Sequence, residues 1–121
     1  MGGLTSVKRG DLVTIAVAGD YGKPRPALVV QADIFAALPS VTVLRLSSEI
    51  IPAHLARITI EPTDQNGLRR RSQVMIDKAI AVPREKIGPR IGCLESGTMQ
   101  AVNHALLTFF GLEDAEARGA D

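Results

Sequence analysis

An arginine held between two prolines is the residue of this sequence best placed to do chemistry. Residues 22–26 read Gly-Lys-Pro-Arg-Pro and lead into an apolar run over residues 27–31. A residue before proline is pushed toward extended backbone geometry, so Arg25 has a restricted backbone at the start of a predicted strand. A planar, permanently charged guanidinium at a fixed place suits a phosphate or a carboxylate. The alternative is a surface arginine beside a proline-rich turn.

Hydroxyl groups and further arginines follow later in the chain. Residues 41–48 predict a strand whose apolar part ends at Ser47 and Ser48, so these two hydroxyls should lie at a strand end. Arg69, Arg70 and Arg71 form a dense basic run. That run is either a solvated loop or a contact for an anion.

An acidic residue lies on a long predicted β segment over residues 72–82. Asp77 follows an apolar stretch there, and alternation places it on the face opposite Ile76 and Lys78. From that position Asp77 could pair with Arg25 and orient it. Equally, it could be an exposed residue of the sheet.

Arg25, a hydroxyl at Ser47 or Ser48, and Asp77 together could cut an RNA phosphodiester without a metal ion. The substrate 2′-OH would be the nucleophile, and the protein would move a proton and neutralise the charged pentavalent phosphorus. An arginine and a positioned hydroxyl can do the second task. The group that moves the proton stays open, because an unperturbed arginine is a poor base.

Other chemistries have little support in the residues. The histidines, His54 and His104, are far apart, and a single cysteine, Cys93, excludes an internal disulfide and a cysteine-cluster metal site. His54 reads as a proton shuttle or a structural hydrogen-bonding group, and His104 as a partly exposed helix residue. There is no Gly-x-Ser-x-Gly nucleophile motif and no phosphate-cradling glycine-rich motif.

The elements that must position these groups are mostly short strands. Strands are expected over residues 11–17, 27–31, 41–48, 57–60, 72–82 and 91–94. Short helical turns are expected at 34–38, capped by Asp33, and at 84–86. A helix should begin with Ser96 as N-cap, end at Gly111, and carry an apolar stripe of Met99, Val102, Leu106 and Phe109. This order predicts a mainly β fold, a strongly bent antiparallel sheet of β-barrel-like or α+β type with one C-terminal helix.

Composition bounds the class of protein. The chain has 121 residues, 45% of them hydrophobic, which suits one domain over residues 1–112 and a disordered charged tail at 113–121. Residues 1–112 hold 13 Lys/Arg and nine Asp/Glu, a net charge of +4 that permits an anionic partner. No signal peptide and no membrane-spanning apolar run is visible, so we expect a cytoplasmic protein with no membrane partner.

The residues also resemble a known family. Arg9-Gly10-Asp11, residues 22–31, residues 42–48 followed by Ile-Pro-Ala-His at 51–54, and residues 99–106 closing at Gly111-Leu112 are similar to MazF/PemK toxins, the mRNA interferases. The resemblance covers about residues 8–112. It implies a small SH3-like barrel, of the type shared by MazF, Kid and the gyrase poison CcdB, and a homodimer with an RNA groove.

The resemblance also implies an activity. It implies metal-independent and cofactor-free cleavage of single-stranded RNA at a short sequence, leaving a 2′,3′-cyclic phosphate and a 5′-hydroxyl. It further implies an antitoxin partner whose acidic segment folds into the groove.

The family's site residues map onto this sequence one by one. The catalytic arginine of the Arg-Pro motif falls on Arg25, and the catalytic threonine falls on Ser47, where serine keeps the hydroxyl but loses the rotamer restraint of a β-branched side chain. An acid that is catalytic in some members falls on Asp77. Lys78 stands where glutamine is frequent. The expected substrate contacts are Lys23, Ser48 and Lys78.

Two other functions fit the same resemblance. One is a non-enzymatic CcdB-like toxin that binds a topoisomerase, but that poison uses a tryptophan near its C-terminus and this chain has none. The other is a degenerate member that binds its antitoxin and no longer cuts. The departures at Ser47 and Lys78 keep the second alternative open.

Overall fold

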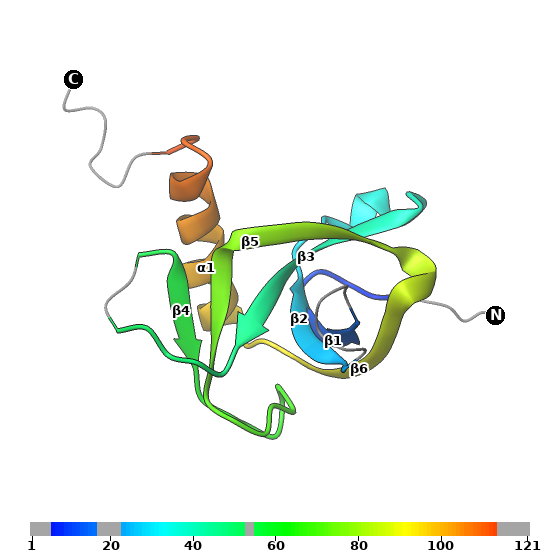
Figure 1. The fold of residues 1–121 in the computed structure, drawn as a ribbon. Helices are drawn as coiled ribbons and strands as arrows, with labels where there is room; N and C mark the ends of the chain where they lie inside the picture. The colour runs from blue at the N-terminus through cyan, green and yellow to red at the C-terminus, as the bar shows by residue number, and fades with distance from the viewer. Residues whose placement is uncertain (1–5, 17–22, 53–54, 114–121) are drawn as a thin grey trace.

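The computed structural model describes residues 6–16, 23–52 and 55–113 of the chain (Figure 1). Its strands are β1 (Asp11–Ile15), β2 (Arg25–Val29), β3 (Ser40–Ser47), β4 (Arg57–Ile60), β5 (Ser72–Pro83) and β6 (Ile87–Cys93). Two 3₁₀ turns, η1 (Asp33–Phe35) and η2 (Arg84–Lys86), and the helix α1 (Ser96–Phe109) complete the fold. The predicted mainly β fold with a C-terminal helix is confirmed.

The strands form one curved antiparallel sheet in the order β4-β5-β3-β2-β1-β6. Strands β1, β2 and β3 are buried on both faces, because alternate residues enter two separate apolar clusters. Leu12, Leu28 and Leu44 belong to one cluster, while their chain neighbours Val13, Val29 and Val43 belong to the other. This double burial explains why residues 27–31 read as an almost continuously apolar run.

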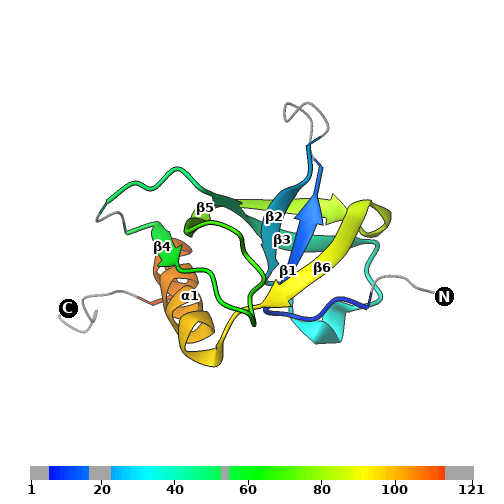
Figure 2. The ribbon, with the colours of Figure 1, turned by 90° about the horizontal axis from the view of Figure 1, so that it is seen from below.

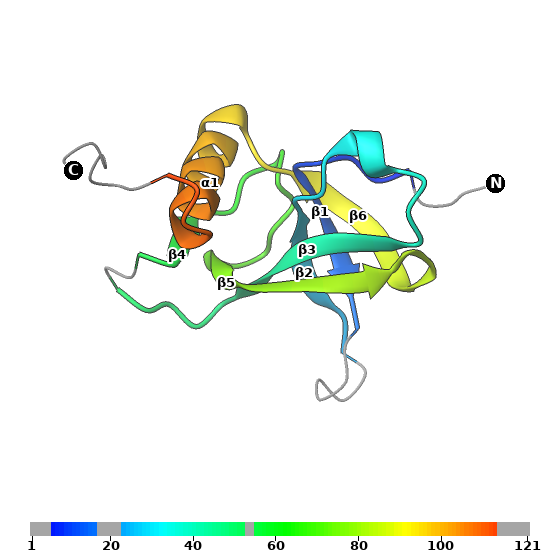
Figure 3. The same cartoon turned by 90° about the horizontal axis from the view of Figure 1, so that it is seen from above.

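The helix α1 covers β4 and β5, at one side of the sheet (Figures 2 and 3). Met99, Val102 and Leu106 pack on the first cluster, as the stripe predicts. Phe109 does not, because it is 49% exposed, so the stripe ends one turn earlier than expected.

Both ends of α1 can be compared with the expected caps. The N-cap is Glu95 and Ser96 is the first helical residue, so the predicted serine cap is wrong by one position. At the other end Gly111 has a φ of 71°, and the N–H of Leu112 donates to the carbonyl of Leu107, which is a Schellman ending. The C-terminal glycine is therefore confirmed.

The curved sheet is closed by the loop over residues 61–71 and not by a strand. The N–H of Cys93 in β6 donates to the carbonyl of Gln65 at 3.0 Å. A Cβ on Gly92 would lie 2.4 Å from the carbonyl oxygen of Gln65, and one on Gly67 (φ 68°) would lie 2.0 Å from that of Ile91. Glycine at both places lets the loop lie directly against β6.

Three local predictions need correction. β2 begins at Arg25, two residues early, so this arginine is part of the ladder opposite Ile15. β6 begins at Ile87, four residues before the expected start at residue 91, and includes the Gly-Pro pair at 88–89; proline is tolerated there because β6 is the last strand in the sheet order. Asp33 does not cap η1, because its carboxylate accepts the backbone N–H of Arg9 at 2.8 Å.

No helix within the described ranges is both long and apolar enough to cross a bilayer. The greater part of the predicted tail, residues 114–121, lies outside those ranges.

Candidate active site

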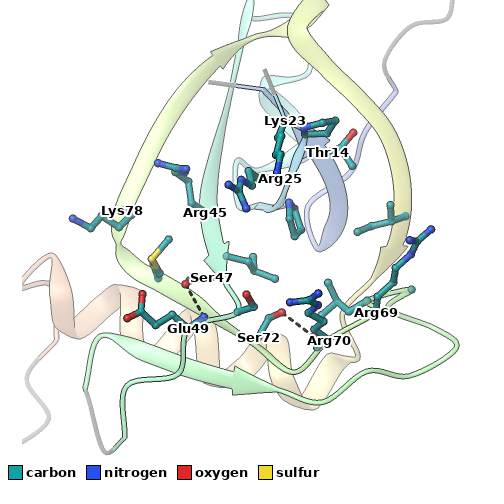
Figure 4. Close-up of a pocket in the computed structure, with 18 residues that line it drawn as sticks. Thr14, Lys23, Arg25, Arg45, Ser47, Glu49, Arg69, Arg70, Ser72 and Lys78 are labelled. Carbon is teal, nitrogen blue, oxygen red and sulfur yellow. Dashed lines mark hydrogen bonds between the residues drawn. The ribbon is translucent and has the colours of Figure 1, made fainter. Parts of the chain in front are cut away.

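A wide groove opens on one side of the sheet (Figure 4). Its volume is about 1100 Å³, and its walls come from β1, the start of β2, the end of β3, the loop at 61–71, β5 and β6. The charged side chains that line it are strongly biased in sign. Six are cationic and one, Glu49, is acidic; the cations are Lys23, Arg25, Arg45, Arg69, Arg70 and Lys78. Such a surface attracts a polyanion.

Arg25 enters this groove from the first residue of β2. Its backbone is fixed by the pairing with Ile15, and Pro24 and Pro26 line the groove on either side of it. The side chain is exposed, and no hydrogen bond or ion pair to another described residue occupies its guanidinium. Arg25 is therefore a cation with a fixed backbone that faces open solvent in a groove, and its catalytic role stays a prediction.

Ser47 reaches the same groove from the last residue of β3. Its Oγ accepts a hydrogen bond from the backbone N–H of Glu49 at 3.0 Å, which leaves its proton free to donate to a ligand. This bond restrains the rotamer of a side chain that has no β-branch. Ser48 also lines the groove and is exposed.

A buried glutamine fixes the chain that follows Ser47. The side chain of Gln73, only 3% exposed, accepts from the N–H of Ile51 and donates to the carbonyl of Ile51, both at 3.0 Å. It also donates to the hydroxyl of Thr59. Since Gln73 pairs with Ser47 in the β3–β5 ladder, it holds the loop after Ser47 at the edge of the groove.

The acid predicted to orient Arg25 has another partner. Asp77 is ion-paired with Arg57 of the neighbouring strand, and it does not line the groove. The pairing of Asp77 with Arg25 that the sequence allowed is therefore wrong. Partial burial raises the pKa of Asp77, but the hydrogen bond and charge of Arg57 outweigh this effect and lower the pKa below its usual value.

The cause of this arrangement is a bulge in β5. Between the pairs Leu44–Ala79 and Leu46–Val74, β3 advances by two residues and β5 by five. The extra residues break simple alternation, so that both Met75 and Lys78 line the groove. Lys23 and Lys78, which the sequence analysis expects as substrate contacts, both line the groove.

Sequence reasoning missed one cation of the groove, Arg45. Arg45 lies two positions before Ser47 on β3, and a period of two would have placed both on one face. Arg69 and Arg70 line the groove, whereas Arg71 is paired with Glu61 outside it. The first two are therefore placed to contact an anion, and Arg71 is a residue of the solvated loop.

The other sequence candidates fall partly outside the described residues. His104 is exposed on α1 and does not line the groove, and His54 and Gly22 lie outside the described residues. Within the described ranges, no cluster of three or more His, Cys, Asp or Glu side chains could hold a metal ion.

Comparison with known proteins places these features in a family. Residues 8–110 match the family described as PemK-like, MazF-like toxin of type II toxin–antitoxin system. The chain is 45% identical over 107 residues to a probable endoribonuclease MazF of Mycolicibacterium smegmatis, covering 88% of this chain and 98% of that protein.

Solved structures show the same fold. An endoribonuclease in complex with its cognate antitoxin, from Mycobacterial species, superposes with a TM-score of 0.75 at 20% identity, covering 88% of this chain and 97% of the other. A MazE–MazF complex from Deinococcus radiodurans gives a TM-score of 0.71 at 17% identity, covering 91% and 98%. With the family match spanning most of its length, the chain belongs to the PemK-like, MazF-like toxins of type II toxin–antitoxin systems.

Proposed function

We propose that this protein is a toxin that acts as a metal-independent endoribonuclease on single-stranded RNA. The observation that carries the proposal is that Arg25 and the hydroxyl of Ser47 line one groove in which cations outnumber carboxylates six to one. A phosphodiester chain is the polyanion that would use a cationic groove, an arginine fork and a hydroxyl donor together. The 45% identity to a probable endoribonuclease supports the same activity.

The reaction needs only the substrate's own nucleophile. The 2′-oxygen attacks the adjacent phosphorus, its proton passes to a base or to water, and the bond from phosphorus to the 5′-oxygen breaks. The 5′-oxygen takes up a proton, and the products are a 2′,3′-cyclic phosphate and a 5′-hydroxyl. Arg25 and Ser47 would donate to the phosphoryl oxygens, where negative charge develops in the transition state.

The other predicted site residues have different parts in this proposal. Lys23, Ser48 and Lys78 line the groove and would contact the RNA on either side of the cleaved bond. Asp77 is held by Arg57 away from the groove lining, so we give it a positioning role: it would fix the β5 bulge that presents Lys78. A direct catalytic role for Asp77 stays a prediction.

The partners and location belong to the same proposal. Membership of a toxin–antitoxin family supports a cognate antitoxin, and an acidic segment of that antitoxin would compete with RNA for the groove. The homodimer and the cytoplasmic location rest on the family resemblance. Sedimentation of the purified toxin at micromolar concentration would give the mass of one chain or of two.

Incubation of the toxin with a long single-stranded RNA in EDTA tests the activity. We expect discrete cuts with 5′-hydroxyl ends for the wild-type protein and none for Arg25→Ala. The matched control is Arg71→Ala, which removes the same charge outside the groove and should cut like the wild type. Cleavage by Arg25→Ala at the wild-type rate would refute the proposed mechanism, and so would cleavage that requires a divalent cation.

A further inference from the structure

The loop over residues 61–71 carries two arginines into the groove on a rigid support. Asn66 is 2% exposed, and its side-chain oxygen accepts the N–H groups of Thr63 and Leu68 at 3.0 and 2.9 Å. Its side-chain nitrogen donates to the carbonyl of Glu61 at 2.9 Å. One buried side chain therefore binds the loop at three points.

The loop is also fixed to the barrel on both sides of Asn66. Leu68 is buried in the first apolar cluster, and the chain at Gly67 lies directly against Ile91 of β6. Beyond the arginines, the hydroxyl of Ser72 donates to the carbonyl of Arg70 at 2.9 Å. The backbone that bears the arginines is therefore held before any ligand arrives, which lowers the entropy cost of binding.

The three consecutive arginines of this loop differ in their surroundings. Arg69 and Arg70 line the groove, while Arg71 donates to the carboxylate of Glu61 at 2.9 Å and does not line it. Figure 4 shows Arg69 and Arg70 together on the part of the groove formed by this loop, apart from Arg25, which comes from β2. Arg69 and Arg70 thus form a second cationic part of the groove, separate from the proposed site of cleavage.

We propose that Arg69 and Arg70 form a phosphate-binding clamp for the RNA backbone beside the cleaved bond, an assignment that rests on the proposed ribonuclease function. An RNA chain whose scissile phosphate lies at Arg25 and Ser47 carries a further charge at each neighbouring nucleotide. Two guanidinium groups on a preformed loop in the same groove bind such phosphates with charge-assisted hydrogen bonds. Contacts of this kind position the RNA without reading its bases.

The salt dependence of binding measures these contacts directly. The probe is a random-sequence 12-nucleotide RNA in which every 2′-hydroxyl is methylated, so that it cannot be cleaved by 2′-hydroxyl attack. For single strands, each phosphate contact contributes about −0.7 to the slope of log affinity against log salt. Arg69→Ala/Arg70→Ala should therefore reduce the steepness of the slope by about 1.4, if each arginine contacts one phosphate.

Two further variants make the experiment specific. Arg71→Ala/Lys86→Ala removes two charges outside the groove and should keep the wild-type slope. Arg69→Lys/Arg70→Lys keeps both charges on the loop and should also retain most of the slope, which excludes misfolding of the loop as the cause. With the cleavable long single-stranded RNA, the Arg69→Ala/Arg70→Ala variant should show a rise in KM that is larger than its fall in kcat.

The outcomes separate the two proposals. The clamp is refuted, and the ribonuclease function stands, if the wild type cuts RNA but Arg69→Ala/Arg70→Ala has the wild-type slope. The same holds if Arg71→Ala/Lys86→Ala reduces the slope as much as Arg69→Ala/Arg70→Ala does. If the Arg69→Ala/Arg70→Ala slope is unchanged while the affinity for a polyglutamate peptide falls, the pair serves an acidic protein segment, and the RNA assignment is overturned. If the wild type neither binds nor cuts RNA, the proposed function fails, and the clamp with it.

Discussion

The side-chain oxygen of Ser47 accepts a hydrogen bond from the backbone N–H of Glu49 at 3.0 Å, at the point where β3 ends in the groove. This bond directs the hydroxyl of a residue that has no β-branch to direct it. It also leaves the hydroxyl proton available to a phosphoryl oxygen. The turn after β3 therefore orients the proposed donor.

Two replacements of Ser47 should distinguish the effect of its hydroxyl on the cleavage rate from the effect of side-chain shape. We expect Ser47→Ala to lower the single-turnover cleavage rate by roughly 10²-fold or more, the usual loss for one donor to transition-state charge. Ser47→Thr keeps the hydroxyl and adds rotamer restraint, so it should stay within a few-fold of the wild type. Rates should be measured at saturating protein with one RNA substrate. Equal rates for Ser47→Ala and wild type would remove Ser47 from the mechanism.

Gln73→Met should destabilise the protein and loosen the loop after Ser47. The methionine keeps the length of the side chain but leaves the N–H and carbonyl of Ile51 without their partner. A lost partner of this kind costs about 1–3 kcal/mol of unfolding free energy. Urea unfolding measures the change, and Gln100→Met, at an exposed position of α1, is the control that should be nearly neutral. Similar stabilities for the two variants would contradict the role given to Gln73.

Two glycine substitutions should act in opposite directions. Gly67→Ala places a Cβ about 2.0 Å from the carbonyl oxygen of Ile91 at a positive φ, so the loop must leave β6 and the melting temperature should fall. Gly97→Ala, where a Cβ would have no neighbour within 4 Å, should stabilise α1 by about 0.5–1 kcal/mol. Calorimetry of Gly67→Ala tests the closure of the barrel by this loop, and Gly97→Ala is the comparison at a position without such a contact. A Gly67→Ala protein as stable as the wild type would show that the contact is dispensable.

The ion pair of Asp77 with Arg57 should make stability depend on pH in the acid range. Because the folded-state pKa of Asp77 is lowered, its contribution is present above the unfolded-state pKa of about 3.9 and is lost as the pH falls through the folded-state value. Near neutral pH, Asp77→Asn should therefore be less stable than wild type, by at most about 1 kcal/mol for a pair partly open to solvent.

The difference between Asp77→Asn and wild type should shrink as the pH falls below about 4, because the carboxyl is then protonated in the unfolded chain before it is protonated in the folded one. Urea unfolding at several pH values between 7 and 2.5 measures this. Asp64→Asn removes one carboxylate at an exposed turn position and is the matched control for the lost charge. A constant gap between Asp77→Asn and wild type over the whole range would mean that the carboxylate is not stabilised by Arg57.

Much of the fold could be predicted because its signals are local. The strand at 57–60 and the helical turn at 84–86 agree with β4 and η2 residue for residue. The double burial of β2 and the glycine after α1 follow from short stretches of sequence. Strand ends were less accurate, because hydrogen bonding to a neighbour, and not the residue pattern, extends β2 to Arg25 and β6 to Ile87.

The sequence by itself determined the mainly β fold, the likeness to the toxin family, and the presence of Arg25 and Ser47 at strand ends. These follow from periodicity, from proline restricting its neighbour, and from motifs that stand together in the chain. Only the tertiary structure decided that Arg69 and Arg70 enter the groove while Arg71 does not, and that Asp77 pairs with Arg57. Those placements depend on the β5 bulge and on the loop lying against β6, which join residues distant in sequence, so no local pattern could predict them.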